Sequence, residues 1–107
     1  MEWLIYVAYF FGGAFLVNAV PHFVSGTMGR AFQSPFAKPP GIGLSSSKVN
    51  VLWGTFNAAV GYVLVVRLGT FDLHNTLHVL AVGAGGLLMA LFTAHHFGKL
   101  HGGDLAG

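Results

Sequence analysis

Imidazoles and amides are the side chains in this chain that are best suited to bind a metal or a ligand. We sort them into two groups. Pairs of imidazoles on neighbouring membrane helices hold b-type haem or transition metals, and two imidazoles at i, i+4 can share a zinc ion. The larger group contains Asn18, His22, Asn50, His95 and His96, and the smaller contains His74 and His78. Any such chemistry requires helices that bring these positions together.

Carboxylates and thiols are scarce, which narrows the reaction classes. The acids Glu2, Asp72 and Asp104 all lie outside the apolar runs, and no Ser, His and Asp spacing suits nucleophilic catalysis. The chain contains no cysteine, so neither a disulfide nor a thiolate metal site can form. We therefore expect a protein that is not an enzyme.

Composition places the chain in a lipid bilayer. Charged residues make up 7% of its 107 residues, against roughly a quarter in ordinary soluble proteins. Apolar residues reach 54%, and the mean hydropathy is +0.69. The net charge of +2 with a pI near 9.3 reflects a shortage of acids, and this excludes a basic surface for nucleic acid.

Three apolar runs are long enough to cross a bilayer, so the predicted fold is all-α, a single domain of three transmembrane helices. The expected spans cover residues 3–24, 49–68 and 75–97, with a structured loop at 25–48 and a flexible tail at 98–107. A cleaved signal peptide is the rival interpretation of the first run, but its length and Glu2 at its start argue against it. The turn between the second and third runs is short, so neighbouring helices should be antiparallel.

The distribution of basic residues predicts the orientation. Arg30, Lys38, Lys48 and Lys99 flank one side of the three predicted spans, and Arg67 flanks the other. By the positive-inside rule the loop and the C-terminus face the cytoplasm, and the N-terminus faces the periplasm.

This topology places the larger polar group at the cytoplasmic end. We expect Asn18, His22, Asn50, His95 and His96 to converge there, roofed by Arg30 and Gln33 of the loop. His78 lies about 27 Å along the helix from His96, so the two cannot share a site within one chain. The metal alternatives are His22 with His96, or His74 with His78. The competing interpretation, which we favour, is that these histidines are polar residues at helix ends and that no cofactor binds.

Asn57 lies near the middle of the second run, where an amide needs a partner. Together with Asn50, Gly54 and Gly61 it forms a narrow stripe at 100° per residue, which predicts a face turned toward protein. We interpret Asn57 as an interhelical polar contact. The alternative is that Asn50 and Asn57 line a path for an ion or a small molecule.

The loop between residues 26 and 43 has two interpretations of equal weight. Arg30 and Gln33, with backbone donors of Gly26, Gly29, Gly41 and Gly43, would cradle an anionic lipid headgroup. Otherwise the prolines stiffen a connector whose phenylalanines dip into the membrane interface.

The loop string GRAFQSPFAKPPGIGLSSSKVNVLWG, from Gly29 to Gly54, resembles a family of small bacterial multi-span membrane proteins with no assigned function. NAVPHF at Asn18–Phe23 and HHFGKLHGG at His95–Gly103 extend the likeness over most of the chain. The resemblance implies the bacterial cytoplasmic (inner) membrane, and it brings no activity, cofactor or partner.

The sequence thus predicts a small integral membrane protein with a structural or accessory role, as a homo-oligomer or as a subunit of a larger membrane complex. The alternatives are a haem- or metal-binding electron-transfer subunit and a small channel or carrier. Absorbance of the purified protein separates the first alternative from a structural role, and flux into liposomes separates the second.

Overall fold

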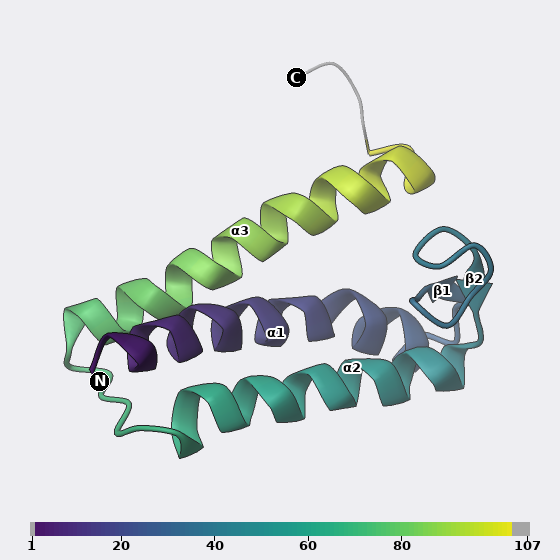
Figure 1. Cartoon of the computed structure of the whole chain (residues 1–107). Coiled ribbons are helices and arrows are strands. Elements are labelled where there is room, and N and C mark those ends of the chain that lie inside the picture. Colours follow the sequence, from purple (N-terminus) through teal and green to yellow (C-terminus); the bar gives the residue numbers. More distant parts are fainter. Residues whose placement is uncertain (1, 104–107) are drawn as a thin grey trace.

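The structure, a computed structural model that describes residues 2–103, consists mainly of three long helices (Figure 1). Helix α1 spans Trp3–Thr27, and α2 spans Ser47–Tyr62 and continues into a short π-helix, η1, at Val63–Arg67. Helix α3 spans Thr76–His101. The three segments of 25, 21 and 26 residues are long and apolar enough to cross a membrane, which confirms the predicted helical, three-span class at this level.

The helix ends are set by caps, and they differ from the predicted bounds by a few residues. Ser46 caps α2 by accepting the Val49 N–H, and Asn75 caps α3 by accepting two N–H groups of the first turn. Gly98, predicted to begin a flexible tail, is helical, so that prediction is wrong for residues 98–101. Helix α3 ends instead at Gly102, whose φ of 79° suits glycine. Residues 104–107 of the predicted tail lie outside the described residues.

Helix α1 is the centre of the bundle because it packs against both other helices, whereas α2 and α3 barely touch within the described chain. In Figure 1, α3 diverges from α1 toward its C-terminal end. Two adjacent glycines allow this double packing. A Cβ on Gly12 would lie 2.5 Å from Val65 Cγ2, and a Cβ on Gly13 would lie 2.0 Å from the Val82 carbonyl oxygen.

The predicted polar and small stripe of the second helix faces α1. Its four members, Asn50, Gly54, Asn57 and Gly61, are the buried residues of α2. Gly54 is in close backbone contact with α1, since a Cβ there would lie 2.7 Å from the Phe23 nitrogen. This helix therefore buries Asn50 and Asn57 against protein and turns Leu52, Phe56 and Tyr62 outward.

The all-α prediction missed a small β-element in the loop. Strands β1 (Phe32–Gln33) and β2 (Leu44–Ser45) pair antiparallel, with Phe32 opposite Ser45. Two-residue strands carry no detectable periodicity, so the sequence pattern could not show them. They fold the loop back beside the C-terminal end of α1 and the N-terminal end of α2 (Figure 1). We call this the loop end of the bundle, and the opposite end, at the connection between η1 and α3, the turn end.

Candidate functional site

His22 and Asn50 form the centre of the polar group at the loop end. His22 Nδ1 lies 2.8 Å from Asn50 Oδ1, and the two side chains are 3% and 0% exposed. The Asn50 amide nitrogen faces three carbonyl oxygens, those of Phe32 (3.0 Å), Ser45 (3.3 Å) and Ser46 (3.1 Å). Since Nδ2 is thus the donor, Oδ1 is the acceptor and His22 donates from Nδ1. Asn50 therefore joins α1, the start of α2 and both strands of the loop.

Helix α3 is held to the same loop by two further imidazoles. His96 Nε2 donates to the Gly41 carbonyl oxygen at 2.7 Å, and His101 Nε2 donates to Gln33 Oε1 at 2.7 Å. Gln33 is 5% exposed, so its amide oxygen has its partner inside the protein. The loop thus contacts all three helices through hydrogen bonds. We call His22, Gln33, Asn50, His96 and His101 the loop-end cluster.

Aromatic rings surround His22, and sequence reasoning had not included them in the site. The ring centroids of Phe32, Phe97 and Trp53 lie 5.5, 5.9 and 6.4 Å from that of His22. Phe32 also stacks on His101 at 5.2 Å. His101 itself was assigned to the tail. One available signal was its spacing, since His101 follows Phe97 by four residues and would share its face if the helix continued.

Three predicted members of the cluster are not in it: His95, Arg30 and Asn18, whose own contact is described below. His95 is exposed, as is Arg30, and neither side chain makes a hydrogen bond within the described residues. The Gln33 side chain enters the cluster through His101, and the Gln33 backbone lies within hydrogen-bond reach of His22. The predicted anion cradle is also changed, because the N–H groups of Gly29, Gly41 and Gly43 donate to carbonyls of their own segment. These N–H groups are therefore already paired within the loop.

His22 and His96, the alternative pair of haem ligands, each make contacts inside the protein. Both rings contact Phe97, at centroid distances of 5.9 and 5.1 Å, and His96 uses Nε2 for its bond to Gly41. Binding of iron through His96 Nε2 would require this nitrogen to exchange that carbonyl for the metal. Among residues 2–103, no three His, Asp or Glu side chains are grouped so as to hold a metal ion.

A second polar contact joins α1 to α2 near the middle of the bundle. Asn18 Nδ2 donates to Asn57 Oδ1 at 3.0 Å, and Asn57 Nδ2 donates to the Trp53 carbonyl at 2.8 Å. Asn57 is 1% exposed. Asn18 therefore lies with Asn57 and not in the loop-end cluster. Because the helices are in contact at Gly54, between Asn50 and Asn57, a path lined by these amides would require α1 and α2 to separate.

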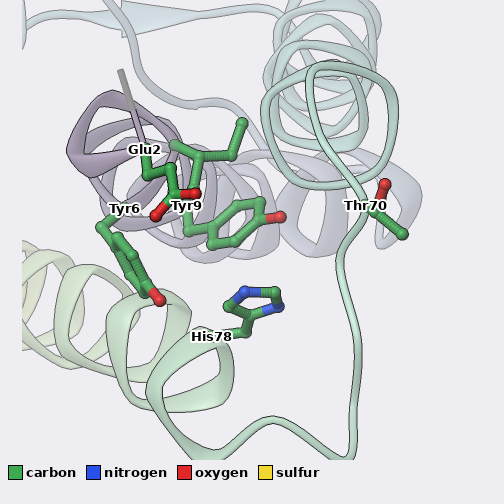
Figure 2. A pocket seen from close by; sticks show the side chains of 6 residues that line it. Glu2, Tyr6, Tyr9, Thr70 and His78 are labelled. Atoms are coloured by element: carbon green, nitrogen blue, oxygen red, sulfur yellow. The ribbon is translucent and has the colours of Figure 1, made fainter.

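The turn end contains a pocket that sequence reasoning missed (Figure 2). It has a volume of ≈ 550 Å³ and is lined by Glu2, Ile5, Tyr6, Tyr9, Thr70 and His78. The rings of Tyr6, Tyr9 and His78 lie in mutual edge contact, with centroids 5.0–6.3 Å apart. The sequence offered one signal, the i, i+3 spacing of the two tyrosines. Their meeting with His78 depends on the rotation of α3, which the sequence pattern does not specify.

The predicted zinc pair at this end does not form a shared site. His78 Nδ1 accepts the Asp72 N–H at 3.1 Å, and the neutral ring therefore carries its proton on Nε2. His74 is exposed, and its N–H donates to Asp72 Oδ1 at 2.8 Å. The two residues thus shape the turn before α3 and flank Asp72 from opposite sides.

No family model matches this chain, and neither the curated proteins nor the solved structures that were compared with it include a match. The argument for function therefore rests on the geometry.

Proposed function

We propose that this chain is a non-enzymatic structural or accessory subunit of the bacterial cytoplasmic membrane, assembled as a homo-oligomer or on a larger membrane complex. The loop and the C-terminus face the cytoplasm in this proposal. Four of its five basic residues, Arg30, Lys38, Lys48 and Lys99, belong to the loop end, which supports that orientation.

The observation that carries the proposal is the limited packing of α3. Its apolar window is 11% buried, against 28% in each of the other two helices. Gly85 and Gly86 are its only buried residues within the described chain, and both face α1. Most of this helix is therefore left for lipid or for another protein.

Small residues on the free surface of α3 favour protein over lipid. A Cβ on Gly83 would meet no atom within 4 Å, and Ala94 is exposed on the same side of the helix. Small residues at such spacing let a second helix approach closely, and close packing is a main source of helix association in bilayers. We infer that this surface, defined by Gly83, Ala90 and Ala94, is the interface.

Cysteine cross-linking tests the proposal cleanly because the chain has no native cysteine. Gly83→Cys and Ala94→Cys should be cross-linked by a short bis-maleimide in native membranes, and Ala84→Cys, on another side of α3, is the matched control. A product of twice the chain mass indicates a second copy, and a heavier product containing another protein indicates a complex. Equal cross-linking at all three positions, or none at any, contradicts the proposal.

A further inference from the structure

The turn-end pocket combines negative potential with hydrogen-bond donors. The faces of aromatic rings carry negative charge density, so three rings beside a carboxylate form surroundings that attract a cation. Tyr6 and Tyr9 supply rings for the cation, His78 presents both a ring face and a donor nitrogen, and Glu2 supplies the carboxylate. Figure 2 shows these side chains around one space, with Thr70 across it from Tyr6.

Charge is distributed unevenly between the two ends of the bundle. Both carboxylates of residues 2–103, Glu2 and Asp72, belong to the turn end, where Arg67 is the single basic residue. The loop end has the other four basic residues. A cation is therefore attracted to the turn end by the nearby charges and not only by the pocket itself.

The other wall of the pocket offers donors. His78 accepts the Asp72 N–H through Nδ1, which leaves its Nε2–H free to donate, and Thr70 contributes a hydroxyl. Tyr9 is 0% exposed, yet its hydroxyl has no hydrogen-bond partner within the described residues. A buried hydroxyl without a partner costs about 1–3 kcal/mol, and such groups are common where a ligand or water completes the site.

The pocket therefore presents an acceptor for a cation on one wall and donors for an anion on the other. It lies at one end of three helices that are long and apolar enough to cross a membrane, which is where lipid headgroups would meet it, and its ≈ 550 Å³ is within the range of small-molecule sites. We propose that it binds an ammonium–phosphate group of the ethanolamine type, with the ammonium at Glu2 and the ring faces and the phosphate toward Thr70 and His78. The inference does not depend on whether α3 has a protein partner.

Lipid retention tests this assignment. The full chain is placed in nanodiscs with equal amounts of phosphatidylethanolamine and phosphatidylglycerol, transferred to mild detergent, and examined by native mass spectrometry. The wild type should retain phosphatidylethanolamine in preference to phosphatidylglycerol. Glu2→Gln should lower this retention about fivefold, as expected for a cation that loses its charged partner at a membrane surface. Asp72→Asn, which neutralises the other carboxylate at the same end but does not line the pocket, should lower retention much less than Glu2→Gln.

A second pair of variants separates the pocket from the general charge of this end. Tyr6→Leu should lower retention, and Tyr62→Leu, at an exposed tyrosine of α2, should not. Equal retention of the two lipids, or equal effects of Glu2→Gln and Asp72→Asn, would overturn the assignment.

The source of the group is distinguished by a soluble competitor. If phosphoethanolamine displaces the retained lipid and glycerol phosphate does not, the ligand is the lipid headgroup. Binding of phosphoethanolamine in the absence of lipid retention identifies a free solute of the same chemistry instead. Failure of both to bind refutes the site.

Discussion

Replacement of Gly85 by alanine should separate α3 from α1. A Cβ at this position would lie 1.7 Å from the Phe10 carbonyl oxygen and 2.6 Å from its carbonyl carbon, and both are backbone atoms that no rotamer change can move. Normal contact needs more than 3 Å, so the two helices must move apart by over an ångström. Overpacking of this kind costs about 1–3 kcal/mol. Alanine is favoured over glycine within a helix by about 1 kcal/mol, which offsets part of this loss.

Gly83→Ala is the matched control, two residues away on the same helix. A Cβ on Gly83 meets no atom within 4 Å, so this variant gains the helix preference without the clash. Reversible unfolding in mixed micelles is followed by tryptophan fluorescence. The free energy of unfolding of Gly83→Ala should equal or exceed that of the wild type if the chain is monomeric under these conditions. Gly85→Ala should be less stable than Gly83→Ala by about 1–3 kcal/mol. Equal stability of the two variants would refute the close contact between α1 and α3.

Three further predictions concern the polar contacts and the topology. Asn57→Leu removes the acceptor of Asn18 and should lower bundle stability by about 1 kcal/mol, measured in the same unfolding assay; an unchanged or higher stability would count against the contact. Asn50→Leu removes the amide that donates to the carbonyls of Phe32, Ser45 and Ser46 and should expose the loop to limited proteolysis, whereas unaltered cleavage would show that the loop is held by other contacts. Reporter fusions after Lys38 and after Asp72 should report cytoplasm and periplasm, and a periplasm-only reporter active at Lys38 would reverse the proposed orientation.

The parts of the fold that follow a helical period could be predicted, and those set by helix rotation could not. The stripe that contains Asn50 and Asn57 was visible because four polar or small residues recur at 100° on an apolar helix, and such residues avoid lipid. The close contact of α3 with α1 uses Gly85 and Gly86, whereas a Cβ on Gly83 of the same helix would meet no atom within 4 Å. On a helix with so many small residues, several faces permit close approach, and the partner decides among them.

The sequence could predict at which end of the bundle the members of the loop-end cluster lie, but not the groups to which they hydrogen-bond. Antiparallel helices place His22, Asn50 and His96 at one end, and no further information is needed for that step. His96 bonds to the backbone carbonyl of Gly41. Because every residue has such a carbonyl, the residue types do not indicate which one is the partner. His101 was missed because Gly98 and the following glycines suggested a break, although only Gly102 takes the left-handed conformation that ends the helix.

The central place of α1 has a consequence for biosynthesis. Because α1 makes nearly all the helix contacts and is synthesised first, each later helix enters the membrane with its docking surface already present. The α1–α2 pair can form once Arg67 has been inserted, before α3 enters the membrane. A released fragment that ends near residue 75 should thus already protect Asn50 and Asn57 from solvent. A fragment that begins after α1 would instead contain two helices with almost no contact between them.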